Sequence, residues 1–218
     1  MTTLMLIGAT GLVGGSVLRQ ALDDIRVTRI VAPARRQLPA HPKLDNPLVD
    51  FERLPSDAPW WPVDGLICTL GTTIRKAGSQ DVFRRVDHDY PLAVAQLARR
   101  HGVRSFALNS ATGADPRSRF FYNRVKGEVE EALRGVGFPS LTIVRPALIG
   151  GNRDEVRPTE FLAMRLLRLT EPLLPRRYRV VPHDRLAQVL LEAAISAPPG
   201  EHTIESDAII DGVARGGI

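Results

Sequence analysis

The stretch Leu4-Met5-Leu6-Ile7-Gly8-Ala9-Thr10-Gly11-Leu12-Val13-Gly14 decides the fold of this chain. Its first four residues form a continuous apolar run, which is typical of a strand buried on both faces of a sheet. Glycines follow at three-residue intervals, and from Val13 onward apolar residues recur at helical spacing. The stretch therefore predicts a strand, a tight glycine turn and the start of a helix.

Short apolar runs and helical patterns alternate along the rest of the chain. Helical spacing recurs over residues 13–22 and 92–100, and Gly102 ends the second pattern. Continuous apolar strands joined by helices suit a parallel sheet that is covered on both faces. The sequence therefore predicts an α/β fold: a doubly wound, mostly parallel sheet with helices on both faces. The other expected strands are Ile30–Ala32, Leu66–Leu70, Ser105–Leu108, Leu141–Val144 and His202–Glu205.

The proline-rich segment from Leu38 to Pro62 interrupts this alternation. We expect little helix there and a short third strand at Val49-Asp50-Phe51. With 218 residues and 44% hydrophobic content the chain can fill one well-packed core, so we expect a single domain over residues 1–218. Residues from about 146 onward should supply the substrate side, and the tail from Gly212 should fray.

The composition excludes several kinds of protein. Cys68 is the only cysteine, which rules out an intrachain disulfide and a four-cysteine metal site and fits a reducing cytoplasm. Its apolar neighbours indicate a buried strand residue rather than a nucleophile. No apolar run approaches the roughly 18 residues of a membrane span, so we expect no membrane partner. The net charge is +5, but the basic residues are dispersed, so we expect no nucleic-acid partner.

The glycine turn predicts an anion site. Backbone N–H groups and the positive end of the helix dipole would converge there, as they do where the pyrophosphate of a dinucleotide binds. Glycines at this spacing could also serve only to pack a helix closely against a strand. We expect the pyrophosphate to contact the glycines and their neighbours: Gly8, Thr10, Gly11, Leu12, Val13 and Gly14.

Two arginines follow the expected second strand, where sites specific for NAD usually carry an acid that binds the ribose 2′-hydroxyl. The planar guanidinium groups of Arg35 and Arg36 suit a 2′-phosphate, so we expect NADP rather than NAD unless this pair is ordinary surface charge. Asp50 and Phe51 could contact the adenine. Leu70-Gly71-Thr72 would approach the cofactor closely at the end of the fourth strand.

Tyr122 and Lys126 carry the chemistry of a possible reaction. They are four residues apart in a helical pattern, so both side chains can point into one cleft. A nearby ammonium favours the phenolate, which would let the tyrosine act as an acid-base, and the same lysine could hold the nicotinamide ribose. An exposed tyrosine that stacks on a lysine stem would show the same spacing.

Hydroxyl side chains follow the expected fifth strand, at the sheet edge where ligands of open parallel sheets bind. Ser110 is our candidate to hydrogen-bond the substrate oxygen while Tyr122 passes the proton. Thr112 is the second candidate for that role. A hydroxyl that only caps the end of the strand would fit the same position.

With the glycine turn, Ser110, Tyr122 and Lys126 in this order, the chain resembles the atypical short-chain dehydrogenases/reductases. It is similar in particular to the Tat-interacting-protein oxidoreductase family, and the likeness covers nearly the whole chain. The stretches that carry it are Cys68 to Thr73 with Lys76-Ala77-Gly78, Val86 to Tyr90, Tyr122 with Val125 to Glu130, Arg145-Pro146, Arg157-Pro158 with Glu160, and Glu205-Ser206 with Ala208-Ile209.

The resemblance implies a Rossmann fold with NADP at the glycine turn, the arginine pair near the 2′-phosphate and Pro146 beside the nicotinamide. It also implies a catalytic site made of the serine, tyrosine and lysine named above. The chain departs from the pattern at two points. Ala111 stands where another serine is common, and no asparagine for the proton relay of many short-chain dehydrogenases is identifiable near Asp87 to Tyr90.

Three functions fit these features. The first is an NADP-dependent oxidoreductase of a small carbonyl or alcohol. The second is an enzyme similar to the nucleotide-sugar epimerases and dehydratases, since transient oxidation needs the same three residues, although such enzymes generally carry a larger C-terminal substrate domain. The third is an NADP-sensing protein-interaction module, which would not need to retain a tyrosine–lysine pair.

The substrate end of the cleft should be covered by residues 157–179. Apolar side chains at partly helical spacing in this segment suggest a small apolar substrate, although core packing would produce the same pattern. We expect the protein to be a monomer or a homodimer.

Overall fold

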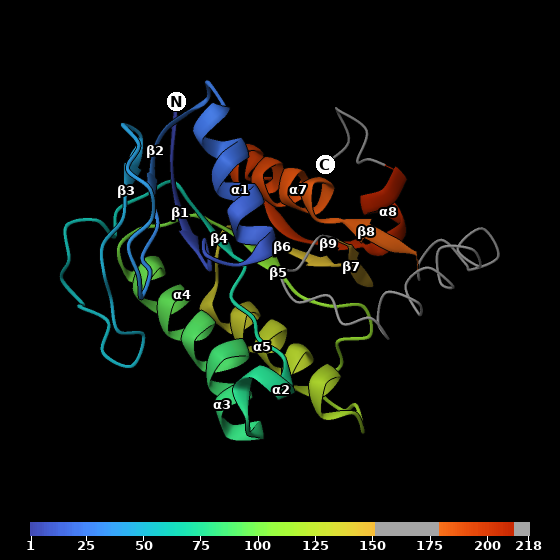
Figure 1. Ribbon diagram of the computed structural model, residues 1–218. Coiled ribbons are helices and arrows are strands. Elements are labelled where there is room, and N and C mark those ends of the chain that lie inside the picture. The colour runs from blue at the N-terminus through green and yellow to red at the C-terminus, as the bar shows by residue number, and fades with distance from the viewer. Residues whose placement is uncertain (151–178, 212–218) are drawn as a thin grey trace.

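A seven-stranded parallel sheet forms the centre of the computed structural model, which describes residues 1–150 and 179–211 (Figure 1). The strand order is β3-β2-β1-β4-β5-β6-β9, and each neighbouring pair is parallel. The chain moves outward from β1 to β3 and returns to β4 on the other side of β1. Doubly wound sheets bind ligands at such a reversal, beside the carboxyl ends of the strands. The strands are β1 (Thr2–Ile7), β2 (Val27–Val31), β3 (Leu44–Asp45), β4 (Gly65–Cys68), β5 (Ser105–Asn109), β6 (Ser140–Arg145) and β9 (Gly200–Glu205).

Long helices cover both faces of the sheet. One face packs against α1 (Leu12–Asp23) and α7 (His183–Ser196), and the other against α4 (Tyr90–Arg100) and α5 (Phe121–Val136) (Figure 1). The shorter elements are α2 (Ile74–Ala77), α3 (Gln80–Arg84), the π-helix η1 (Arg85–Asp89) and α8 (Ser206–Asp211). A separate pair of parallel strands, β7 (Leu148–Gly150) and β8 (Val180–Pro182), lies beside the main sheet.

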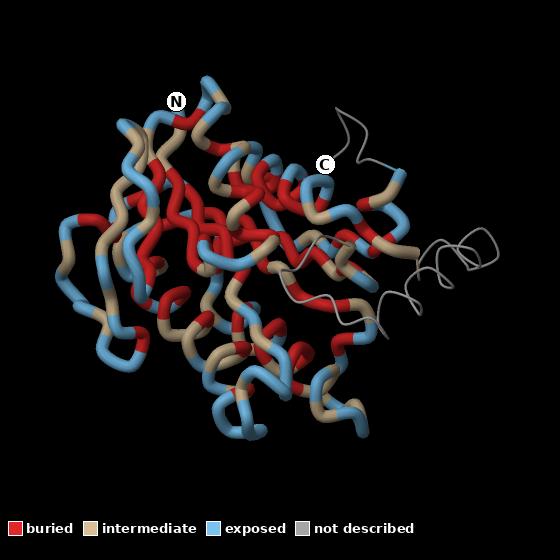
Figure 2. The backbone as a smooth tube through the Cα atoms, in the orientation of Figure 1, coloured by how far each residue is buried: buried red, intermediate tan, exposed pale blue. Residues whose placement is uncertain are grey.

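The apolar run of β1 explains how the two layers are held. Leu4 and Leu6 point into the core shared with α1 and α7, whereas Met5 and Ile7 point into the core shared with α4 and α5. All four side chains are almost completely buried. Figure 2 shows this burial as a continuous red band along the central strands. Side chains alternate between the faces of a strand, so a run without polar residues requires cover on both sides.

The structure confirms the predicted fold class and corrects one strand. The third strand is Leu44–Asp45, paired with Ile30 and Val31, and not Val49-Asp50-Phe51. Residues 50–53 form a turn instead, because the Asp50 carboxylate accepts a hydrogen bond from the Glu52 N–H at 3.0 Å. The expected lack of helix between residues 38 and 62 is confirmed. The predictions for residues 157–178 and for the tail from Gly212 lie outside the described residues.

Candidate functional site

The glycine turn is dictated by close backbone packing. Gly8 has a φ of +89°, and a Cβ atom on it would lie 2.6 Å from the carbonyl carbon of Thr69. A Cβ atom on Gly14 would lie 2.1 Å from the carbonyl oxygen of Gly8. Neither distance is possible in a real structure, so both positions require glycine. The turn therefore packs directly against the end of β4.

The start of α1 is open to an anion. Gly11 is the N-cap residue, it provides no side-chain hydrogen bond, and the first turn of the helix contains no acidic residue. A Cβ atom on Gly11 would meet only the Gly8 carbonyl oxygen, at 3.4 Å, so protein packing tolerates a larger residue there better than at the other two glycines. The N–H groups of the first helical turn are thus available to a negatively charged ligand.

A cleft of about 520 Å³ joins the loops that follow β1, β2 and β4. Arg35 and Arg36 are both exposed on the wall of this cleft. Among the residues that the structure describes, neither arginine has a carboxylate within ion-pair distance. The structure therefore brings six of the predicted cofactor residues into one cavity. Its lining is Gly8, Ala9, Thr10, Pro33, Ala34, Arg35, Arg36, Phe51 and Leu70.

The Phe51 wall of the cleft is held in place by contacts with residues of η1 and α4. The Phe51 ring stacks on Tyr90 with 5.6 Å between the ring centres. The Tyr90 hydroxyl donates to Glu52 Oε1 at 2.5 Å, and Arg85 reaches the same oxygen at 3.1 Å. Burial and the Glu52 carboxylate both raise the pKa of Tyr90, so its hydroxyl keeps its proton and remains a donor.

The other predicted cofactor residues lie outside this cavity. Leu12 and Val13 begin α1 beside the glycines, and the Asp50 carboxylate is bonded within its own turn. Gly71 and Thr72 lie further along the loop after β4, against the side chain of Asp87. The carbonyl of Pro146 accepts a hydrogen bond from the Thr112 N–H at 2.9 Å. Whether these residues contact a cofactor remains a prediction.

Tyr122 and Lys126 lie on one face of α5 at its first turns. The tyrosine is 40% exposed, and its ring packs against the buried Phe83 with 5.8 Å between the ring centres. The lysine is buried. The two residues are four positions apart on α5, so their side chains lie one turn apart on the same face, as their spacing predicts.

Asp87 is a site residue that the sequence analysis missed. Its Oδ1 lies 2.8 Å from Lys126 Nζ, and its Oδ2 accepts a hydrogen bond from the Thr72 N–H at 2.8 Å. The residue is buried in η1, the type of helical irregularity that often occurs at functional sites. Burial alone would lower the pKa of Lys126, but the Asp87 carboxylate, together with Tyr122 and Cys68, outweighs this effect and holds the pKa above its ordinary value. The ammonium therefore stays charged.

Ser110 donates to a buried carboxylate. The residue is 4% exposed, and its Oγ donates to Glu130 Oε1 at 2.5 Å. Arg145 binds both oxygens of Glu130, at 3.0 and 2.5 Å, and also reaches Glu205 at 3.1 Å. Glu130 is 1% exposed whereas Tyr122 is 40% exposed, so the Ser110 hydroxyl is directed deeper into the protein than the tyrosine ring. Its role toward a substrate remains a prediction.

Thr112, the second candidate, also has an acceptor within the protein. Its hydroxyl donates to the Arg145 carbonyl oxygen at 3.0 Å, and the side chain is half-buried. The hydrogen-bond pattern therefore does not separate the two hydroxyl candidates, because each would have to turn its proton toward an incoming substrate oxygen.

Comparisons with known proteins identify the family. No model of a known protein family matches the chain. It is 34% identical over 214 residues to protein HTATIP2 of Rattus norvegicus, an alignment that covers 95% of this chain and 88% of the rat protein. The chain belongs to the family of HTATIP2 and FMP52. It is also 38% identical over 173 residues to the mitochondrial protein fmp52 of Emericella nidulans, covering 75% of this chain and 73% of that protein.

Solved structures show the same Rossmann fold. The enzyme WbmH of Bordetella bronchiseptica, solved in complex with NAD+, aligns with a TM-score of 0.69 at 16% identity, over 94% of this chain and 76% of that chain. A putative NAD-dependent epimerase/dehydratase from Bacillus halodurans aligns with a TM-score of 0.67 at 16% identity, over 97% of this chain and 99% of that chain. The HTATIP2/FMP52 family member described here therefore shares its architecture with proteins of the epimerase/dehydratase type.

Cys68 lies beneath the site of this HTATIP2/FMP52 family member without taking part in it. It ends β4 and is completely buried, and burial raises the pKa of its thiol to about 12. The thiol therefore stays protonated and unreactive at neutral pH. None of the described helices is both long enough and apolar enough to cross a membrane.

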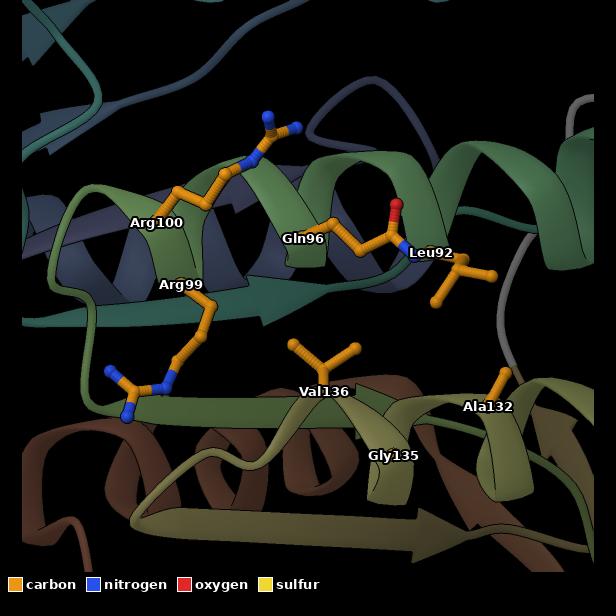
Figure 3. Close-up of a pocket in the computed structure, with 7 residues that line it drawn as sticks. All are labelled: Leu92, Gln96, Arg99, Arg100, Ala132, Gly135 and Val136. Carbon is orange, nitrogen blue, oxygen red and sulfur yellow. The ribbon is translucent and has the colours of Figure 1, made fainter.

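A second hollow of about 550 Å³ lies between α4 and α5 (Figure 3). These helices run from the carboxyl edge of the sheet back toward its amino edge, and the lining residues Arg99, Arg100, Gly135 and Val136 are near their last turns. The hollow is thus at the opposite edge of the sheet from the glycine turn. Leu92, Gln96 and Ala132 complete its lining.

Proposed function

We propose that this protein is an NADP-dependent oxidoreductase that acts on a small carbonyl or alcohol. The observation that carries the proposal is the course of the loop after β4. Leu70 lines the cleft that contains the glycine turn and the arginine pair, and two residues further on the Thr72 N–H donates to the buried Asp87 carboxylate at 2.8 Å. Asp87 in turn holds Lys126. One short loop therefore connects the cleft of about 520 Å³ with the tyrosine–lysine pair.

The cleft residues fit NADP in three ways. The open start of α1 and its dipole suit the pyrophosphate. Arg35 and Arg36 have no carboxylate partner in the described part of the chain, and their guanidinium groups suit a 2′-phosphate. The Phe51 side chain offers an apolar wall for the adenine. The solved neighbours named above concern NAD, but the arginine pair favours NADP over NAD in this chain.

The protein's own groups would manage the proton in this reaction. A bound dinucleotide would supply or accept the hydride. Tyr122, which is exposed in the first turn of α5, would exchange the proton with the substrate oxygen. The charged Lys126 would place a positive charge one helical turn from that tyrosine, and Ser110 would hydrogen-bond the substrate oxygen after releasing Glu130.

The proposal also covers the substrate, the partners, the oligomeric state and the location of the protein. We propose a small, apolar substrate, no nucleic-acid or membrane partner, a monomer or homodimer in solution, and a cytoplasmic location. The fungal relative carries the word mitochondrial in its name, which describes that protein alone.

A second candidate function is an NADP-sensing interaction module. It is favoured by the way two catalytic candidates are engaged within the protein: Lys126 with Asp87, and Ser110 with Glu130. Such a protein would bind the nucleotide in the same cleft without turning over a substrate. Under this alternative, nucleotide binding sets the surface that a protein partner recognises, and the tyrosine–lysine pair transfers no proton.

The experiment that separates the two candidates is a turnover assay with NADPH and a panel of aldehydes and ketones. We expect NADPH oxidation with at least one carbonyl. Tyr122→Phe should abolish it while leaving the NADPH affinity within a few-fold, because only proton transfer in the transition state is lost. Tight NADPH binding without turnover of any carbonyl, or of alcohols with NADP, would overturn the oxidoreductase proposal in favour of the sensing module.

A further inference from the structure

The loop that carries the arginine pair is held at both ends by one side chain, that of Asn46. Its Nδ2 donates to the Ala32 carbonyl oxygen at 2.7 Å, and its Oδ1 accepts a hydrogen bond from the Leu38 N–H at 2.8 Å. Ala32 directly follows β2, and Leu38 is the first residue after the arginine loop. The amide thus closes residues 33–37, with both arginines between its two contacts.

The segment that follows Asn46 supports the same loop through its backbone. The Ala34 N–H donates to the Pro47 carbonyl at 3.1 Å, and the Val49 N–H donates to the Ala34 carbonyl at 2.9 Å. These bonds pair the middle of the arginine loop with a chain that runs on toward Phe51 in the cleft wall. Asn46 adds the side-chain contacts that fix the entry and the exit of the loop.

The charges around the loop also favour the binding of an anion by the two arginines. Asp45, the neighbour of Asn46, is paired with Arg29 at 2.7 Å. Position 46 itself carries a neutral amide. Arg35 and Arg36 are exposed on the cleft wall and form no ion pair with any described residue. The loop therefore presents its two positive charges to the cleft while the carboxylate beside it is already bound.

We propose that Asn46 is a positioning residue that sets the preference for a nucleotide with a phosphate on its adenosine ribose. This inference rests on the proposed NADP function. Arginine side chains lose considerable freedom when they bind a phosphate, and a loop fixed in advance reduces what must be ordered on binding. Asn46 acts through the arginines and does not itself contact the nucleotide.

The amide group is the chemistry that this role needs. One contact requires a donor, toward the Ala32 carbonyl, and the other requires an acceptor, toward the Leu38 N–H. A carboxylate would keep the acceptor, lose the donor and place a negative charge close to the phosphate site. Alanine would lose both contacts without adding charge, so Asn46→Ala is the cleaner variant.

The test is a set of binding titrations of NADPH and NADH, followed by nucleotide fluorescence, on five proteins. They are the wild type, Asn46→Ala, the Arg35→Ala/Arg36→Ala pair, the triple variant, and Gln37→Ala as the matched control, since Gln37 is exposed in the same loop. We expect Asn46→Ala to raise the Kd for NADPH about tenfold and the Kd for NADH less than about threefold. Gln37→Ala should change neither. In the background without the arginines, Asn46→Ala should leave the ratio of the two Kd values unchanged.

Two results would overturn the role of Asn46. One is an equal loss of NADPH and NADH affinity in Asn46→Ala, which would indicate a general structural role. The other is a change of the Kd ratio that persists in the triple variant, since Asn46 would then not act through the arginines. A wild type that binds NADPH no better than NADH would overturn the proposed NADP function, and with it this inference. That failure is visible before any variant is made.

Discussion

Lys126 Nζ lies 2.8 Å from Asp87 Oδ1, and both side chains are buried. The pair contacts the backbone of the loop after β4, because Asp87 Oδ2 accepts a hydrogen bond from the Thr72 N–H at 2.8 Å. The positive charge beside Tyr122 is therefore shared with a carboxylate that is fixed to the Thr72 N–H. Any account of the tyrosine as an acid-base must include this carboxylate.

Asp87→Asn should destabilise the protein in a pH-dependent way. Removing one partner of a buried ion pair costs about 3 kcal/mol at pH 7, since the remaining charge is left without compensation. In the wild type the raised pKa of Lys126 keeps the ammonium, and its stabilising pair, up to the unfolded value of 10.5 and above. In the variant both contributions of Asp87 are lost, while burial, the largest single influence on the Lys126 pKa, remains and is opposed only by Tyr122 and Cys68, so we expect that pKa to fall below 10.5. The unfolded state then binds more protons, and stability should rise with pH.

The measurement is the free energy of unfolding from urea titrations at pH 7 and pH 10. The deficit of Asp87→Asn relative to the wild type should shrink between the two pH values. Asp81→Asn is the matched control, because Asp81 is exposed on α3, and it should change the free energy by less than about 0.5 kcal/mol. A deficit that is independent of pH would contradict the claim that Asp87 sets the charge of Lys126.

Removing the arginine pair should convert the cofactor preference. In the Arg35→Ala/Arg36→Ala variant we expect the Kd for NADPH to rise about 100-fold, since charge-assisted hydrogen bonds contribute about 1.5–3 kcal/mol each. The Kd for NADH should change less than about threefold, because the cleft residues shared by both nucleotides are untouched. Arg53→Ala, at an exposed arginine just beyond the Phe51 wall, serves as the control. An unchanged NADPH to NADH ratio would refute the assignment of the 2′-phosphate site.

The sequence predicts the parts of this molecule whose contacts are local. The glycine turn and the arginine pair each follow a strand directly, so the carboxyl edge brings them into one cleft. Asp87 and Glu130 could not be predicted because each contacts a residue that is distant in the sequence. Asp87 pairs with Lys126, and Glu130 accepts a hydrogen bond from Ser110. Asp87 belongs to the stretch Val86 to Tyr90 that carries the family resemblance, but nothing local distinguishes it from Asp89. The third strand was misplaced because a two-residue strand leaves no periodic pattern.

Substituting Ser110 and Thr112 separately should identify the hydroxyl that polarises the substrate. Ser110→Ala removes the donor to Glu130, and Thr112→Val removes the donor to the Arg145 carbonyl. If Ser110 has this role, its variant should lower kcat/KM about 100-fold with the NADPH affinity unchanged, and Thr112→Val should lower it less than about tenfold. The assay is steady-state NADPH oxidation with the best carbonyl from the panel. The opposite ranking would transfer the role to Thr112.

Adjacent glycines at the start of α1 offer a matched pair of substitutions. A Cβ atom on Gly14 would lie 2.1 Å from the Gly8 carbonyl oxygen, so Gly14→Ala must push the helix away from the turn. We expect a loss of about 2–3 kcal/mol of unfolding free energy and of measurable nucleotide binding. A Cβ atom on Gly15 meets nothing closer than the Ala9 carbonyl oxygen at 3.8 Å. Gly15→Ala should therefore stabilise the protein by about 0.5–1 kcal/mol in thermal or urea unfolding. Equal effects of the two variants would contradict the packing described for the turn.

Cys68 should make the protein lose stability at alkaline pH. Its thiol has a pKa of 9.0 in the unfolded chain, and burial raises that pKa to about 12 in the folded protein. Below pH 9 the thiol is protonated in both states, whereas between pH 9 and 12 only the unfolded chain releases the proton. Stability should therefore fall in that window, by up to about 1.4 kcal/mol per pH unit relative to Cys68→Ala, and urea titrations at pH 8, 9.5 and 10.5 would measure the difference. Iodoacetamide at pH 8 should alkylate the wild type only after unfolding. Rapid alkylation of the native protein, or parallel pH profiles for the two proteins, would show that the thiol is not the buried group found at the end of β4.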